Sequence, residues 1–301
     1  MKYALPMKNK TRFSELLDAG GPIVIDGGLA TQLQAQGCDI DNPLWSASII
    51  QADPLQIVAA HRVYLDAGAQ IIISASYQAT EPELVAGAAH LAMRARDEFV
   101  ADNPDATFPL VAGSVGPYGA VLADGSEYTG DYDKDRAGLV AFHAPRIAQL
   151  DASAVDILAC ETIPSIDEAS ALSELLLGVA TPAWVTFSCR DDARISDGTS
   201  IEVAAQLFQD HPSVKAIGVN CTAPQHIESL IARIRRTLPD MPIIVYPNSG
   251  EDFDAVSKTW SGTTTTDDWM AAAKIWRSAG ARIVGGCCRT TPEHVAAIGK
   301  G

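Results

Sequence analysis

Eight runs of apolar and β-branched residues recur along the chain of 301 residues, and most are hydrophobic throughout instead of alternating with polar residues. Strands that are covered on both faces have this pattern, which is typical of a parallel sheet flanked by helices. The runs are Ile23–Gly28, Gln70–Tyr77, Pro109–Pro117, Val155–Thr162, Ala183–Cys189, Lys215–Cys221, Pro242–Asn248 and Ala281–Cys288.

Helix signals separate these runs: capping residues, first-turn prolines, apolar residues at helical spacing and glycine stops. They lie at Asp53–Gly68, Ser165–Leu176, Thr222–Ile234, Asp267–Gly280 and Thr291–Glu293. Ser165 with Glu168, and Thr222 with Gln225, have the spacing of capping boxes. Strands and helices therefore alternate along the chain.

Eight strands alternating with helices predict an α/β fold, a single-domain (β/α)8 TIM barrel over residues 1–301. A doubly wound open sheet is the alternative, but no Gly-x-Gly-x-x-Gly follows the first run, which counts against a dinucleotide-binding fold. No linker or low-complexity segment divides the chain. No apolar stretch reaches 18 residues, so we expect no membrane partner.

The net charge is −15, which disfavours nucleic acid as a partner because an acidic surface repels phosphates. Arg233, Arg235 and Arg236 come closest to a basic cluster, and they fit the solvated end of a helix. The acidity favours either a cationic small molecule or simple solubility. The six cysteines, with no secretory signal at Met1–Phe13, predict a cytoplasmic protein with free or metal-bound thiols.

Active sites of TIM barrels lie at the carboxyl ends of the strands. The predicted ends are rich in polar residues and thiols. They are Asp26-Gly27-Gly28, Ser76-Tyr77, Gly116-Pro117, Glu161-Thr162, Cys189, Asn220-Cys221, Asn248 and Cys287-Cys288. Two strand-to-helix segments, Tyr118–Asp135 and Ser249–Asp267, are long and are candidate lids.

Three of these thiols, Cys221, Cys287 and Cys288, predict a half-open zinc site, because Zn²⁺ prefers thiolates and takes four ligands. Adjacent cysteines reach one ion only where the strand has ended, and Gly285-Gly286 permits that bend. A zinc centre with three thiolates favours ionisation of a substrate thiol, which then attacks an electrophilic carbon, over hydrolysis.

Other interpretations of the same residues stay open. Cys38, Cys160 and Cys189 fit small buried hydrophobes, although Cys189 also ends a strand. A strained vicinal disulfide would join Cys287 to Cys288. A barrel hydrolase would want histidines at the strand ends, and a non-enzymatic zinc or redox thiol protein would need only the cysteines.

Longer stretches resemble the homocysteine S-methyltransferase family, in the branch that uses S-methylmethionine or S-adenosylmethionine. The matching stretches are residues 26–31, 43–47, 75–80, 112–120, 159–162, 218–221, 246–250 and 285–292. The combination of Val219-Asn220-Cys221 with a distant Gly285-Gly286-Cys287-Cys288 is specific for that family. The resemblance covers nearly the whole chain.

The resemblance implies transfer of a methyl group from a sulfonium donor to the thiol of L-homocysteine, giving methionine, with Zn²⁺ on the three cysteines. It implies that Asp26 and Glu161 bind the homocysteine amino group. The candidate contacts of the homocysteine substrate are Gly27, Gly28, Ser76, Tyr77, Asn220 and Asn248. The candidate contacts of the sulfonium are Tyr77, Tyr118 and Trp260.

Overall fold

The computed structural model describes residues 12–40, 46–250, 252–254, 259–261 and 265–300. Within them, eight parallel strands form one sheet in the order β1-β10-β7-β6-β5-β4-β3-β2. Ile25 pairs with Ile71, and the N–H of Asp26 donates to the Ile71 carbonyl at 3.1 Å, so the two edge strands meet. The sheet is therefore a closed barrel, as predicted.

Each predicted run contains one barrel strand. The strands are β1 (Ile23–Val24), β2 (Ile71–Ile73), β3 (Leu110–Val115), β4 (Ile157–Ile163), β5 (Ala183–Phe187), β6 (Val214–Asn220), β7 (Ile243–Tyr246) and β10 (Ala281–Val284). Their residues are almost all buried, which explains the continuous hydrophobicity of the sequence.

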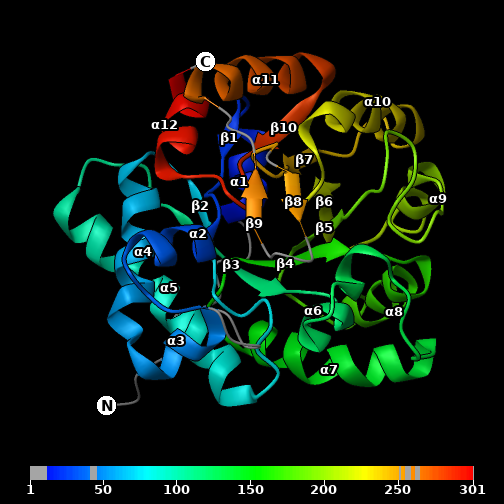
Figure 1. The fold of residues 1–301 in the computed structure, drawn as a ribbon, viewed down its shortest axis with the longest axis horizontal. Helices are drawn as coiled ribbons and strands as arrows, with labels where there is room; N and C mark the ends of the chain where they lie inside the picture. Colours follow the sequence, from blue (N-terminus) through cyan, green and yellow to red (C-terminus); the bar gives the residue numbers. More distant parts are fainter. Residues whose placement is uncertain (1–11, 41–45, 251, 255–258, 262–264, 301) are drawn as a thin grey trace.

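Helices surround the barrel (Figure 1). They are α1 (Arg12–Asp18), α2 (Leu29–Ala35), α3 (Ser46–Ala52), α4 (Pro54–Asp66), α5 (Pro82–Asp102), α6 (Tyr118–Leu122), α7 (Arg136–Ala152), α8 (Ile166–Leu176), α9 (Ile201–Gln206), α10 (Ile227–Thr237), α11 (Thr266–Ala279) and α12 (Pro292–Lys300), with 3-10 turns η1 (Ser126–Tyr128) and η2 (Pro224–His226). Among the described helices, none has the length and apolar character needed to cross a bilayer.

The core has two layers. Side chains inside the barrel, among them Trp184 and Tyr246, form one cluster, and Phe13 of α1 joins it with its ring 6.0 Å from that of Trp184. A larger cluster lies between the strands and the surrounding helices. Filling the barrel interior in this way leaves the carboxyl ends of the strands as the place for a site.

The helix start predicted at Ser165 is confirmed, although its capping box is incomplete, and the start predicted at Thr222 is wrong. The Ser165 hydroxyl accepts from the Glu168 N–H at 3.3 Å, but the Glu168 side chain bonds to other elements, so only half of that capping box forms. The Thr222 hydroxyl donates to the Asn220 carbonyl instead of capping a helix, and α10 begins at Ile227 after the turn η2. In both cases tertiary contacts outcompete the local motif.

The later helix boundaries follow the sequence more closely. Thr265 and Asp268 form a complete capping box, so α11 begins at Thr266, before the predicted Asp267. The helix ends at Gly280, whose φ of 118° only glycine adopts easily. Pro292 opens α12 as predicted.

Both long strand-to-helix segments contain regular structure. The first holds α6 and η1, and η1 contacts β4 and α6. The second holds an antiparallel hairpin of β8 (Asp252–Asp254) and β9 (Thr259–Ser261). Trp260 lies in β9, but its side chain lies outside the described part of the chain, as does most of the 43–47 motif. The role of the two long segments, 118–135 and 249–267, as lids stays a prediction.

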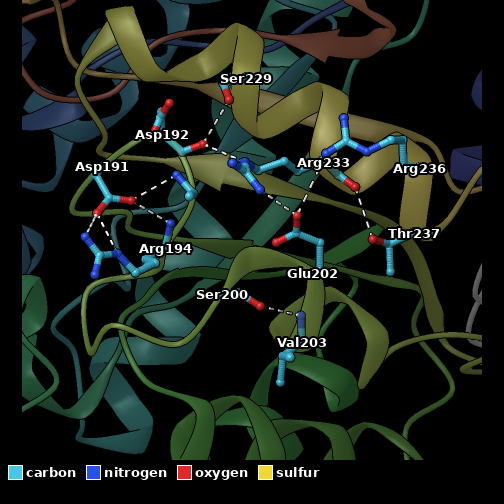
Figure 2. Close-up of polar contacts among 11 residues, drawn as sticks. Asp191, Asp192, Arg194, Ser200, Glu202, Val203, Ser229, Arg233, Arg236 and Thr237 are labelled. Atoms are coloured by element: carbon cyan, nitrogen blue, oxygen red, sulfur yellow. Dashed lines mark hydrogen bonds and ion pairs between the residues drawn. The ribbon is translucent and has the colours of Figure 1, made fainter.

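The segment between β5 and α9 is bonded to α10 (Figure 2). The Asp192 carbonyl accepts from Ser229 Oγ at 3.0 Å and from Arg233 Nε at 3.1 Å, and Arg233 pairs with Glu202 at 2.8 Å. Arg235 donates to the carbonyl of Gly280 at 2.8 Å. These arginines lie near the end of a helix, as predicted, and they make contacts within the chain.

Candidate metal centre

Three cysteines converge at the carboxyl ends of β6 and β10. The sulfurs of Cys221, Cys287 and Cys288 all lie within 4.8 Å of one another, and those of Cys221 and Cys288 are 3.8 Å apart. A tetrahedral ion with zinc–sulfur bonds of about 2.3 Å needs sulfurs roughly 3.8 Å apart. Strand β7 lies between β6 and β10, so the two ends border the same part of the barrel mouth. The cluster therefore fits a thiolate-bound ion.

Cys221 and Cys287 form a disulfide in the structure, with Cα atoms 5.6 Å apart, whereas Cys288 is free. The sequence suggests a vicinal disulfide between Cys287 and Cys288 as an alternative, whereas the observed disulfide joins the ends of β6 and β10. A cysteine binds zinc as a thiolate, so Cys221 and Cys287 serve as ligands only in the reduced protein. The same three sulfurs thus form either a disulfide with a free thiol or a set of three ligands.

The backbone of Cys287 and Cys288 is held by the segment that follows β7. The N–H of Cys287 donates to the Pro247 carbonyl at 2.8 Å, and the Cys288 carbonyl accepts from the Ser249 N–H at 3.0 Å. Cys221 itself has a φ of 44°. A left-handed conformation in a residue with a side chain is costly, and such residues concentrate at functional sites.

The two glycines before the cysteines serve close packing. The strand β10 ends directly before them, and neither has a positive φ, so the chain leaves the strand there without the left-handed conformation. A Cβ on Gly285 would lie 2.2 Å from the Ile25 side chain, and one on Gly286 would lie 2.3 Å from that of Thr290. Gly28 is similar, because its Cβ would lie 2.6 Å from the Cys287 carbonyl oxygen. Gly285 and Gly28 let the end of β1 and the residues after it approach the cysteine pair, and Gly286 makes room for Thr290.

Two buried carboxylates lie in the same mouth. Asp26 is 2% exposed, and its Oδ2 accepts from the Ile73 N–H at 2.8 Å. Glu161 is 7% exposed and accepts from the Ser114 hydroxyl and from Tyr246. Among the described residues no ion pair includes either carboxylate.

Burial perturbs both acids. It raises the pKa of Glu161 to about 7, although the bonds from Ser114 and Tyr246 act in the opposite direction. It also raises the pKa of Asp26 well above its ordinary value, and the negative charge of Glu161 adds to that rise. Two buried acids that lack a cation favour a ligand that supplies one, such as an ammonium group.

Ser76 lies beneath these acids in a network of hydroxyls. Its Oγ donates to the Ser114 carbonyl at 2.8 Å and is 2.9 Å from the hydroxyl of Ser74, which in turn accepts from the Ser114 N–H. Ser76 is fully buried. Its observed contacts therefore support Ser114 and, through it, the Glu161 carboxylate.

The two candidate asparagines differ in their surroundings. Asn220 is fully buried, and its amide bonds to the backbone and hydroxyl of Thr162 at 2.7 Å and to the Thr186 hydroxyl at 2.8 Å. Those contacts hold Thr162, the left-handed residue after Glu161. The side-chain oxygen of Asn248 is buried without a hydrogen-bond partner, so it is free to accept from a ligand.

The three candidate aromatic contacts also differ. The Tyr77 hydroxyl bonds to Thr162, which follows Glu161, and burial, with the charge of Glu127, raises the pKa of Tyr77. The ring of Tyr118 packs instead on Tyr132 and Phe142, and Lys134 lies 4.4 Å above it. For Trp260 the structure describes only its backbone position in β9.

The sequence missed two residues of the η1 turn. Tyr128 contacts the Cys288 thiol through its hydroxyl, which works against the burial that raises the pKa of that thiol to about 11. Glu127 is buried beside it, 6% exposed. Both follow Gly125 in the segment 118–135, which the sequence marks only as a candidate lid, and no motif singles out these two residues within it.

Buried charges behind the site fix the loops. Glu168 accepts from the Tyr118 N–H at 2.7 Å, from the Tyr132 hydroxyl and from His143 at 2.7 Å, so it joins both ends of the segment that carries η1. Arg146 donates to the carbonyls of Gly116 and Tyr77. These residues are positioning groups that the sequence analysis did not identify.

The fold and this centre define a class: a (β/α)8 barrel with a cysteine cluster and buried acids at its mouth. Residues 23–301 match the family model described as homocysteine S-methyltransferase. The chain is 43% identical over 300 residues to homocysteine S-methyltransferase YbgG of Bacillus subtilis, covering 94% of this chain and 95% of that protein. The chain belongs to the homocysteine S-methyltransferase family.

Solved structures agree with this assignment. The metallated form of the homocysteine methyltransferase MmuM from Escherichia coli is 39% identical, with a TM-score of 0.86 over 96% of this chain and 99% of that one. The oxidized form of the same protein also has a TM-score of 0.86, over 97% of this chain and 99% of that one.

Proposed function

We propose that this chain transfers a methyl group from a sulfonium donor, S-methylmethionine or S-adenosylmethionine, to the thiol of L-homocysteine, giving methionine. The observation that carries the proposal is the convergence of three cysteine sulfurs within 4.8 Å at a barrel mouth that also buries two unpaired acids. Membership of the family supports the acceptor and the reaction type.

Cys221, Cys287 and Cys288 would hold Zn²⁺, since their spacing and their thiol chemistry fit that ion. Bound there, zinc would ionise the homocysteine thiol at neutral pH, because a coordinated thiol loses its proton. A free thiol has a pKa of about 8.5, so only a few per cent of it is ionised without such help.

The chain's own residues would orient the acceptor. Asp26 and Glu161 would hold its ammonium group, and the free amide oxygen of Asn248 would accept another hydrogen bond from a substrate. Holding the amino acid at one end fixes the direction of its sulfur, and orientation of this kind lowers the barrier to transfer. Methyl transfer from a sulfonium to a thiolate needs no general base.

The test is to incubate the reduced, zinc-loaded protein with L-homocysteine and each donor separately and to quantify methionine. We expect one zinc per chain and methionine from at least one of the two donors. A protein that binds no zinc after reduction, or that forms no methionine with either donor, would contradict the proposal.

The disulfide between Cys221 and Cys287 favours one second candidate, a redox-responsive thiol protein. Such a protein would exchange between the disulfide and the dithiol without consuming a sulfonium. Counting free thiols before and after reduction, together with the methionine assay, separates the two functions, because only a methyltransferase couples the reduced form to product.

A further inference from the structure

Glu127 is a buried carboxylate that no cation neutralises within the described residues. Glu127 is 6% exposed, and its Oε2 has no hydrogen-bond partner among the described residues. Burying a charge without a partner is unfavourable, and it raises the pKa of Glu127. A carboxylate kept in such a place indicates a ligand that supplies the missing positive charge.

The backbone is built to keep Glu127 in this position. The η1 turn packs so closely on α6 that a Cβ on Gly119 would lie 2.4 Å from the Glu127 N. The Glu127 carbonyl accepts from the Ser188 hydroxyl, beyond the end of β5, at 3.2 Å. Gly125, with a φ of 87°, turns the chain just before it. The backbone that carries the carboxylate is therefore fixed before any ligand binds.

Its neighbours connect it to the metal centre. The Tyr128 hydroxyl contacts the Cys288 thiol, while the residue as a whole is 41% exposed, so Tyr128 extends from solvent to the cysteine cluster. The Ser188 hydroxyl that holds the Glu127 carbonyl also lies 3.5 Å from the Thr162 carbonyl, and the Tyr77 hydroxyl bonds to Thr162. Glu127 thus lies on the side of the centre where Cys288 and two tyrosines meet.

We propose that Glu127, with Tyr77 and Tyr128, forms the subsite for the cationic methyl donor. The inference rests on the proposed function, in which Asp26 and Glu161 already hold the ammonium group of homocysteine. The donor is the second cation of the reaction. Carboxylates and the faces of tyrosine rings are the groups that attract an onium ion.

The chemistry decides which kinetic constant Glu127 affects. The homocysteine thiolate attacks the methyl carbon, the bond between that carbon and the donor sulfur breaks, and its electron pair stays on the donor as a thioether. The positive charge of the sulfonium is disappearing in the transition state. A carboxylate beside the donor therefore stabilises the bound donor at least as much as the transition state, and its loss raises the donor KM and not the homocysteine KM.

The test compares Glu127→Gln with Asp124→Asn in the reduced, zinc-loaded full chain. Asp124 is an acid of the same segment whose Oδ1 accepts from the Ser126 N–H at 3.0 Å, and an asparagine keeps that acceptor. We expect E127Q to raise the KM for S-methylmethionine roughly tenfold to a hundredfold, the range for a lost contact with a charged group. We expect D124N to leave it within about twofold, since exposed charges contribute little.

A second donor distinguishes the two positive groups of S-methylmethionine. Dimethylsulfonioacetate carries a sulfonium but no ammonium group. A rise in KM for both donors in E127Q assigns the carboxylate to the sulfonium, and a rise for S-methylmethionine alone assigns it to the ammonium. An unchanged donor KM in E127Q, an equal rise in D124N, or a rise in the homocysteine KM alone would overturn the subsite.

Calorimetric titration of S-methylmethionine into the protein without homocysteine measures the same contact without turnover. Methionine formation by the wild-type chain with an unaltered donor affinity in E127Q would refute this inference and leave the proposed function intact. Glu127→Asp, which keeps the charge, should restore part of the affinity. Equal loss in E127D and E127Q, with native near-ultraviolet circular dichroism in both, would also refute the role of the charge.

Discussion

Glu161→Gln should make the empty protein more stable while weakening its binding of homocysteine. Burial raises the pKa of Glu161 from 4.5 to about 7 in the folded chain. At about 1.36 kcal/mol for each pKa unit, keeping this group ionised costs the folded state about 3 kcal/mol. Glutamine removes that cost but makes the bonds from Ser114 and Tyr246 neutral, a loss of about 1 kcal/mol. The expected net gain at pH 8 is about 2 kcal/mol.

The sign depends on pH in a defined way. The folded pKa lies above the unfolded one, so between pH 4.5 and 7 the unfolded chain gives up its proton first, and the stability of the wild type falls as pH rises. The variant lacks this dependence. Its advantage in the free energy of unfolding should therefore widen by about 2 kcal/mol between pH 5 and pH 8.

Urea denaturation of both proteins, reduced and free of metal, measures that difference directly. The KM for homocysteine should rise about tenfold in the same variant, because the ammonium group loses a charged partner. A stability difference that does not change with pH would refute the buried charge as its cause. An unchanged homocysteine KM would refute the ammonium contact.

Other substitutions test the rest of the site. Cys287→Ala should abolish both bound zinc, measured by atomic absorption, and methionine formation, whereas Cys38→Ala should preserve them. Gly28→Ala should lower zinc affinity by about tenfold or more, measured by competition with a chelator, since its Cβ would displace the Cys287 carbonyl and misplaced groups of this kind typically weaken a metal site by that factor. Arg146→Met should reduce the free energy of unfolding by about 3 kcal/mol, measured with urea, because it removes a buried charge from the carbonyls that it holds, one of them that of Tyr77.

The barrel could be predicted because its strands carry their own signal. A strand such as β4 is buried along its whole length, and its sequence is hydrophobic for that reason. The hairpin of β8 and β9 and the turn η1 carry no such signal, since each has only three residues, most of them polar. Helix boundaries were predicted where local groups decide, as at Gly280, and missed where tertiary partners decide, as at Thr222.

The metal centre follows the same division. Cysteines at strand ends are visible in the sequence because the continuous hydrophobic run of each strand stops there. The close approach of Ile25, at the end of β1, explains Gly285, and this contact depends on barrel closure and has no local signature. The sequence predicts that Glu168 completes a capping box with Ser165. Its observed partners come from α6 and α7, and the local sequence does not reveal them.

The charges at the barrel mouth explain which ligands the site should select. Asp26, Glu161 and Glu127 are buried acids without a cation among the described residues, and three thiols lie beside them. In a medium of low effective dielectric constant these acids repel one another, and the charge of Glu161 adds to the burial that raises the pKa of Asp26. A neutral thiol would leave that repulsion in place, whereas homocysteine brings an ammonium group and the donor brings a sulfonium. The two substrates would relieve the repulsion at different carboxylates, so each makes the mouth less negative without competing for the other's partner.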